Sequence, residues 1–300
     1  MRDLFIMPGQ FGLSVALATP FQLSGAVDNG LLTEQASWCL ARGCSSITLF
    51  GTTGEGASIG LAEREATFAA LARAGIAGDR IVGGIAATAV TDAVAQASLA
   101  LDHGCRALLV PPPYFFKGVA EDGVFGWYAA LVERLGQRAR NMLLYNIPQM
   151  TAVAMPLSLI TRLIRAFPEA FIGVKDSAGD WAYTEQLLEA HRDRVILVGD
   201  ERSLARAVRN GGQGAISGLA NICPDALLPL VVDGRPDQRV DQLVETVLGY
   251  PVMAAIKALV AHRSGEPGWL TMRPPLTALS RAEMAQLGER CDRIFSATAA

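Results

Sequence analysis

Lysine is rare in this 300-residue chain, and this narrows any lysine chemistry to three candidates. Lys117, Lys175 and Lys257 are the only lysines, and the remaining basic residues are arginines. There are 26 basic and 29 acidic residues, which gives a formal net charge of -3. Because the chain has no basic excess with which to hold a phosphate backbone, we expect no nucleic-acid partner.

Signals for disulfides, metals and membranes are also lacking. The five cysteines are odd in number and show no C-x-x-C spacing, so a reducing compartment such as the cytoplasm fits better than a disulfide scaffold. His103, His191 and His262 lie too far apart in the sequence to indicate a zinc site, and we expect no metal. The charge-free stretch 141–161 contains prolines, which a spanning helix disfavours. We therefore expect a cytoplasmic protein with no membrane partner.

Short apolar runs recur along the chain, and each is followed by a turn and a helical pattern. The runs are continuous rather than alternating, which is typical of strands buried on both faces of a parallel sheet. Eight such units predict a (β/α)8 TIM barrel. An open doubly wound sheet is the alternative, but it usually carries a phosphate-binding glycine fingerprint, which we do not find. The predicted strands are Leu13–Ala18, Ser46–Phe50, Ile81–Ile85, Ala107–Val110, Met142–Tyr145, Ile172–Val174, Val195–Val198 and Ala215–Ser217.

The strand rhythm stops after Ser217, and the rest of the chain has helical patterns. The last helix is predicted to begin at a capping box formed by Ser280 and Glu283. We therefore predict a catalytic barrel over residues 1–223 and a C-terminal helical domain over residues 224–300.

Lys175 follows a predicted strand, at the end where such barrels carry their functional residues. Its side chain should enter an apolar barrel mouth, where desolvation disfavours the charged ammonium. A neutral amine can attack a ketone and form a Schiff base. The alternative is a lysine paired with a neighbouring carboxylate such as Asp176. Lys257 lies inside a helical pattern and Lys117 in a loop, so both are weaker candidates.

Two other strand ends carry groups suited to the same chemistry. Thr52 and Thr53, between Gly51 and Gly54, offer hydroxyls and backbone N–H groups that suit a small carboxylate, although an ordinary capped turn is an equal alternative. Tyr145 ends the fifth strand, where a phenol can carry protons or simply pack as a barrel tyrosine.

The ends of strands six to eight supply further candidates for substrate contact. Asp200 and Glu201 could accept hydrogen bonds from a polyhydroxy tail, or could simply cap a helix. Ser177 follows strand six and Ser217 ends strand eight, so both face the same end of the predicted barrel.

Several segments, in order along nearly the whole chain, resemble the dihydrodipicolinate synthase / N-acetylneuraminate lyase family. They are strongly specific for the family and weakly specific for the substrate. The segments are Thr19-Pro20-Phe21, Gly51-Thr52-Thr53-Gly54-Glu55, Tyr145-Asn146-Ile147-Pro148 and Gly173-Val174-Lys175-Asp176-Ser177, with Arg273-Pro274-Pro275-Leu276 as a tail motif.

The resemblance implies a barrel with a C-terminal helical domain, a homotetramer built as a dimer of dimers, and a Schiff-base lyase acting on pyruvate. By position, Lys175 would form the imine and Tyr145 would relay protons. Thr52 and Thr53 would hold the carboxylate, with Thr52 joining the relay. Main-chain groups near Gly199 and Ile216 would line the pocket. No cofactor or metal is implied, because the imine itself supplies the electrophile.

Two departures bear on the substrate. Relatives that make dihydrodipicolinate precursors carry an arginine where this chain has Met150, and a tyrosine lent across the subunit interface where it has Phe115. Glu201 after Asp200 resembles the pair by which the sialic-acid lyase branch holds substrate hydroxyls. We therefore expect a 2-keto-3-deoxy sugar acid as substrate. The alternatives are 4-hydroxy-tetrahydrodipicolinate synthase, a dehydratase or deaminase of the same family, and a non-catalytic barrel that binds a keto acid.

Overall fold

Eight parallel strands close into a barrel in this computed structural model, which describes residues 10–296. Each strand pairs with the next along the chain, and the eighth pairs with the first. This confirms the predicted TIM barrel and rules out the open sheet. The strands are β1 Gly12–Ala16, β2 Ser46–Leu49, β3 Ile81–Gly84, β4 Ala107–Val110, β5 Met142–Asn146, β6 Phe171–Asp176, β7 Val195–Val198 and β8 Gly214–Ser217.

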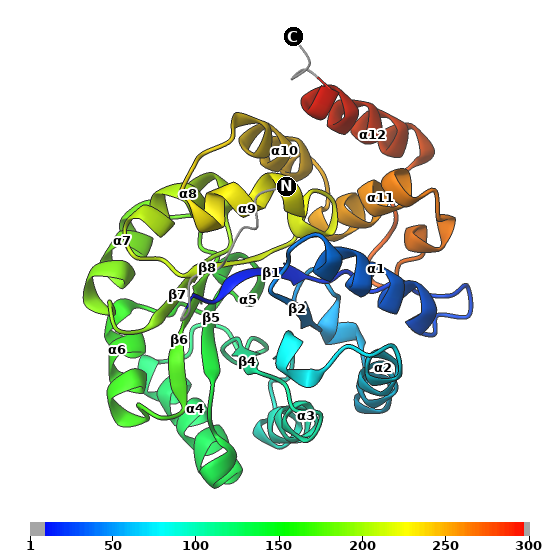
Figure 1. Cartoon of the computed structure of the whole chain (residues 1–300). Helices are drawn as coiled ribbons and strands as arrows, with labels where there is room; N and C mark the ends of the chain where they lie inside the picture. The colour runs from blue at the N-terminus through cyan, green and yellow to red at the C-terminus, as the bar shows by residue number, and fades with distance from the viewer. Residues whose placement is uncertain (1–9, 297–300) are drawn as a thin grey trace.

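A ring of helices surrounds the barrel, and Figure 1 shows the strands at its centre. The strand residues are almost all buried because this ring covers their outer face while side chains fill the interior. The helices of the ring are α1 Asn29–Ala41, α2 Leu61–Arg73, α3 Val90–Asp102, α4 Glu121–Leu135, α6 Leu157–Ala166, α7 Trp181–Ala190 and α8 Glu201–Arg209, with the short α5 Pro148–Thr151 between β5 and α6.

The barrel interior is a small apolar cluster, distinct from the larger core between strands and helices. Leu143 and Tyr145 of β5 belong to this inner cluster, whereas Leu144 belongs to the outer core. This alternation follows from the two-residue period of a strand. Such a packed interior leaves the mouth of the barrel as the place for functional side chains.

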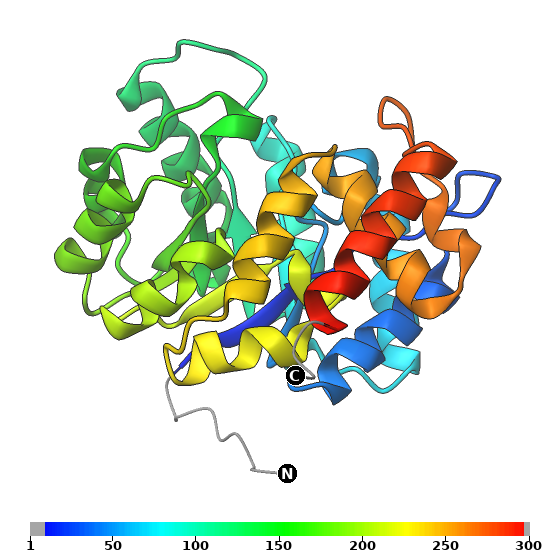
Figure 2. The same cartoon turned by 90° about the horizontal axis from the view of Figure 1, so that it is seen from above.

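The C-terminal helices pack against one side of the barrel, as Figures 1 and 2 show in yellow to red. α12 contacts both α10 and α11. The predicted capping box is present, because Ser280 N donates to Glu283 Oε2 at 2.8 Å and Glu283 N donates to Ser280 Oγ at 3.3 Å. These helices are α9 Pro224–Val232, α10 Gln238–Leu248, α11 Val252–Ser264 and α12 Arg281–Ser296.

Several strand ends differ from the prediction by one or two residues, and the end of β6 is the one that bears on the site. Lys175 was expected just after a strand ending at Val174, but β6 continues to Asp176. The backbone pairs Tyr145 with Lys175 and Asn146 with Asp176, and this ladder extends β6 past the apolar residues that marked it in the sequence.

Across residues 10–296, the chain forms no helix of the length and apolar character that a bilayer span requires.

Candidate active site

Lys175 and Tyr145 meet at the mouth of the barrel because β5 and β6 are neighbours in register. The two residues are paired across the strands, so their side chains point to the same inner face. Lys175 Nζ donates a hydrogen bond to the Tyr145 hydroxyl at 3.2 Å and lies 4.4 Å from the centre of its ring. Both side chains are buried. A primary amine therefore contacts a phenol in a site largely shielded from water.

Thr52 extends this contact to a third group. It lies in the loop that follows β2, and its Oγ1 is 3.4 Å from the Tyr145 hydroxyl. The amine, the phenol and the threonine hydroxyl thus form a continuous chain from three different strand ends. Such a chain can move a proton between a substrate and a side chain.

Glycines set the path of the loop that carries Thr52 and Thr53. A Cβ added at Gly54 would lie 2.7 Å from the Leu17 carbonyl oxygen, and one at Gly56 would lie 1.8 Å from the Phe50 carbonyl oxygen. Only glycine allows the backbone to pass this close to its neighbours. The loop is therefore fixed by packing rather than free.

A cavity of about 480 Å³ opens above Lys175 and collects most of the predicted residues. The predicted residues that line it are Thr52, Thr53, Tyr145, Lys175, Ser177, Gly199, Asp200, Glu201 and Ile216. Ser217 is the exception: its side chain is buried, and its Oγ hydrogen-bonds Glu201 Oε1 at 2.5 Å. A neighbouring apolar cavity of about 260 Å³ shares Thr52 and Tyr145 with the first, so the two spaces meet beside the phenol.

The carboxylate of Asp176, named in the alternative interpretation of Lys175, is hydrogen-bonded to other residues. Its Oδ1 accepts from Asn146 Nδ2 at 2.8 Å, and its Oδ2 accepts from Thr184 Oγ1 at 2.6 Å. Burial raises the pKa of Asp176. The strand alternation turns this side chain away from Lys175, so Asp176 ties β6 to β5 and α7 instead.

The acidic pair at the start of α8 divides into two different environments. Asp200 caps the helix and forms a two-pronged ion pair with Arg202, at 3.0 Å from Nε and 2.7 Å from Nη2. Glu201 is buried, and that burial raises the pKa of its carboxyl group. Asp200 therefore caps a helix, as one interpretation predicts, and it also lines the cavity.

The two departures from the family pattern lie in different surroundings. Met150, on α5, lines both cavities and is 52% exposed, so an uncharged side chain stands where the resemblance places an arginine in other members of the family. Phe115 is 72% exposed in the loop after β4 and packs edge-on against Phe116. Neither side chain carries a hydrogen-bond donor.

One wall of the cavity was not predicted from the sequence. Helices α10 and α11 cover the cavity with apolar side chains: Val244, Val247, Leu248, Val252, Met253 and Ile256. Apolar residues at helical spacing indicate a core face, and nothing in the pattern indicates that part of this face lines a cavity.

Among the residues that the structure describes, no cluster of three or more His, Cys, Asp or Glu side chains could hold a metal ion.

Comparison with known proteins identifies the family. Residues 10–293 match the model of the dihydrodipicolinate synthetase family. An uncharacterized DapA-like lyase of Chloroflexus aurantiacus is 32% identical, with 96% of this chain and 98% of the relative covered. A 4-hydroxy-tetrahydrodipicolinate synthase of an Anaeromyxobacter species is also 32% identical, with the same coverage.

One solved structure is very similar to this chain in both fold and sequence. The dihydrodipicolinate synthase of Agrobacterium tumefaciens superposes with a TM-score of 0.94 at 47% identity, covering 95% of this chain and all of the other. The 2-keto-3-deoxygluconate aldolase of Sulfolobus solfataricus, 19% identical with a TM-score of 0.84, shares the fold. The chain therefore belongs to the dihydrodipicolinate synthetase family.

Proposed function

We propose that the chain cleaves or forms a 2-keto acid through an imine on Lys175, with pyruvate as the imine-bound partner. As a member of its family it is a pyruvate-dependent carbon–carbon lyase. The observation that carries the residue assignment is the buried contact between Lys175 Nζ and the Tyr145 hydroxyl, with Thr52 Oγ1 beside it.

The proposed cleavage begins when the Lys175 amine attacks the keto carbon. Loss of water from the resulting carbinolamine gives a protonated imine, and the Tyr145 hydroxyl moves the protons that this step requires. The C4 hydroxyl then loses its proton, the C3–C4 bond breaks, and its electron pair passes into the imine. An aldehyde leaves, C3 of the remaining enamine takes a proton, and water releases pyruvate from Lys175.

The threonine loop is proposed to hold the carboxylate next to the keto group. Thr52 and Thr53 both line the cavity near Lys175, and a loop of this kind presents hydroxyl and backbone N–H donors. Fixing the carboxylate would orient the keto carbon toward the amine, which is the main contribution that a binding group makes to rate.

A 2-keto-3-deoxy sugar acid is the proposed substrate. Met150 cannot donate to a second carboxylate, and loss of one charge-assisted hydrogen bond weakens binding by about 1.5–3 kcal/mol. Glu201 and Ser177 line the cavity and offer polar atoms to substrate hydroxyls. The competing proposal is 4-hydroxy-tetrahydrodipicolinate synthase, which the names of the relatives favour. A dehydratase or deaminase would use the same imine.

We also propose a homo-oligomer, a dimer of dimers, working in the cytoplasm. Phe115 and Phe116 form an exposed aromatic pair in the loop after β4, and exposed apolar groups of this kind mark contact surfaces. Analytical ultracentrifugation should show a tetramer that Phe115→Asp weakens. A parent that sediments as a monomer at every concentration contradicts this proposal.

A substrate panel tests the reaction. Purified protein is incubated with 2-keto-3-deoxygluconate and related sugar acids, and separately with pyruvate plus aspartate semialdehyde, while pyruvate release or consumption is followed. We expect fastest turnover with a sugar acid and none in Lys175→Ala. Faster reaction with aspartate semialdehyde selects the synthase. Pyruvate binding that survives Lys175→Ala, without turnover in the parent, selects the non-catalytic barrel.

A further inference from the structure

A second buried lysine contacts the loop that carries Thr52. Lys257 on α11 donates to Glu55 Oε1 at 2.9 Å, and the two side chains are 1% and 0% exposed. Lys257 Nζ also donates to the Thr271 carbonyl oxygen at 2.6 Å and lies 4.6 Å from the centre of the Phe21 ring. This amine is held by protein groups and lines neither cavity, so it is a weaker candidate than Lys175 for imine formation.

Glu55 ends the turn that begins at Thr52. Its backbone N–H donates to the Thr52 carbonyl oxygen at 3.0 Å, and the next N–H, of Gly56, donates to the Gly51 carbonyl oxygen at 3.1 Å. Glu55 has φ of 53°, a left-handed conformation that is unfavourable for a residue with a side chain. A surrounding structure must hold such a residue in place, and its buried side chain offers the means.

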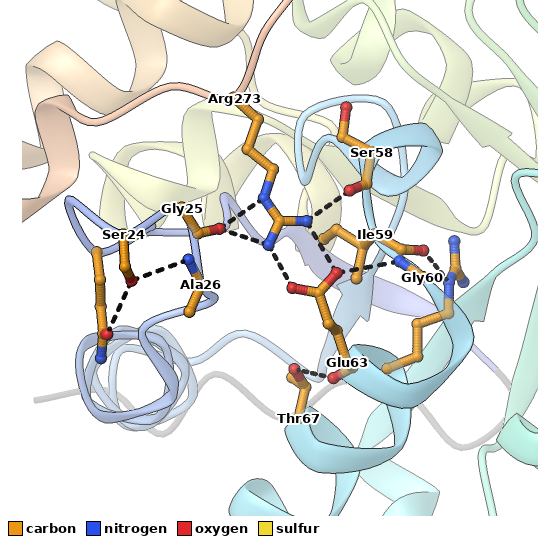
Figure 3. Close-up of polar contacts among 11 residues, drawn as sticks. Ser24, Gly25, Ala26, Ser58, Ile59, Gly60, Glu63, Thr67 and Arg273 are labelled. Atoms are coloured by element: carbon orange, nitrogen blue, oxygen red, sulfur yellow. Dashed lines mark hydrogen bonds and ion pairs between the residues drawn. The ribbon is translucent and has the colours of Figure 1, made fainter.

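Arg273, in the tail segment, holds the far end of the same loop. Figure 3 shows its guanidinium between two loops, where it donates to the Ser58 carbonyl oxygen at 2.6 Å and to the Gly25 carbonyl oxygen at 2.8 Å from Nε. It also pairs with Glu63 on α2. We call Lys257, Thr271 and Arg273 the C-terminal clamp.

From these contacts we propose that Lys257, acting through Glu55, is a positioning residue that sets the place of Thr52 against Tyr145. The proposal rests on the proposed function, in which Thr52 works with Tyr145. Thr52 Oγ1 and the phenol are 3.4 Å apart, near the limit of a hydrogen bond, so a small shift of the loop separates them. Lys257, which lines neither cavity, then contributes to catalysis without touching the substrate.

A purely stabilising role explains the buried pair less well. Two charges removed from water lose hydration that their attraction only partly restores, and apolar replacements of similar size are often as stable. Glu55 Oε2 has no hydrogen-bond partner among the described residues, so the pair is not even fully satisfied. The directional hydrogen bond between Lys257 and Glu55 fixes the position of the loop relative to α11. An apolar contact, which has no preferred direction, would not do so.

The test uses pyruvate alone, because exchange of its methyl protons in D2O requires imine and enamine but no second substrate. The double variant Glu55→Gln/Lys257→Met removes both charges and leaves neither unpaired. We expect borohydride to trap pyruvate at Lys175 in this variant as in the parent. We expect the saturated exchange rate to fall about ten- to a hundredfold, since a misplacement near 1 Å has effects of that order. Hydrogen exchange of the amides of residues 51–56 should become faster.

The control is Leu131→Ala, a core truncation on α4 whose residue is buried but not part of the site. It should lower the melting temperature and leave pyruvate exchange unchanged at 25 °C. If the double variant does not fold, the single variant Glu55→Gln takes its place in the test. We expect its rate of pyruvate proton exchange to fall about two- to tenfold. A folded variant that exchanges pyruvate within twofold of the parent overturns the clamp. A parent that neither traps nor exchanges pyruvate overturns the proposed function instead.

Discussion

Tyr145 is the residue on which the proton transfers depend, because its hydroxyl contacts both Lys175 and Thr52. Tyr145→Phe keeps the ring in the barrel interior and removes only this hydroxyl. We expect the rate of pyruvate proton exchange to fall about 10²- to 10⁴-fold, the usual contribution of a positioned acid–base group. The melting temperature should change little. A variant that keeps more than about a tenth of the parent rate would show that another group moves the proton.

Glu201 gives a prediction about pH. Burial raises the pKa of its carboxyl group above the ordinary value of 4.5, so folding favours the protonated form. The contribution of this form to the free energy of unfolding is fully present below about pH 4.5. It is lost as the pH rises through the folded-state pKa. Glu201→Gln cannot ionise and should avoid this loss.

The measurement compares melting temperatures of parent and Glu201→Gln from about pH 4 to about pH 8. The difference between the variant and the parent should grow in favour of the variant as the pH rises. A difference that is constant with pH, or that shrinks, would mean that Glu201 keeps its ordinary ionisation in the folded protein.

Among individual residues, those that follow a predicted strand could be inferred from the sequence, whereas contacts between distant segments could not. Lys175, Tyr145 and Thr52 were predictable because each follows an apolar run at the functional end of a barrel. The assignment of Ser217 to the substrate site stays a prediction, because its buried hydroxyl hydrogen-bonds Glu201, a residue that lines the cavity. The pairing of Lys257 with Glu55 joins residues 202 positions apart, and a single sequence has no signal for such a pair.

Strand β6 gives a prediction at the scale of elements. A Cβ at Gly173 would lie 1.9 Å from the Val195 carbonyl oxygen of β7, so Gly173→Ala must push the two strands apart. We expect the free energy of unfolding to fall by about 2–3 kcal/mol, at the upper end of the range for an overpacked interior. Pyruvate exchange should fall too, because β6 carries Lys175.

Gly126→Ala is the matched control for that change. Gly126 lies inside α4, and a Cβ there would meet nothing within 4 Å. Alanine is the better helix former, so this variant should gain about 0.5–1 kcal/mol of stability. Urea unfolding of both variants measures the contrast. Equal stability of the two would mean that β6 and β7 adapt to the added methyl group.

Elements were predictable where local pattern and final burial agree. The eight apolar runs gave the strands because parallel strands are buried on both faces. The prediction erred at the end of β6, where backbone pairing with β5 continues through Lys175 and Asp176. The wall supplied by α10 and α11 was not predictable either, since their apolar residues read only as a core face.

The whole molecule is expected to unfold in one step, although the sequence predicts a boundary after residue 223. Lys257 and Arg273 lie beyond that boundary and contact Glu55, Ser58 and Glu63 before it. Because these contacts are buried or half-buried, the barrel and the C-terminal helices should lose their structure together. Calorimetry of the full chain should give a single heat-absorption peak, and two resolved peaks would contradict this expectation.

Covalent capture of pyruvate is the measurement that tests the central claim most directly. The protein is incubated with pyruvate and borohydride, digested, and mapped by mass spectrometry, so that each of the three lysines is read separately. The account predicts a reduced pyruvate adduct on Lys175 alone, blocked by Lys175→Ala. An adduct on Lys117 or Lys257, or an unmodified chain after saturating treatment, would contradict it.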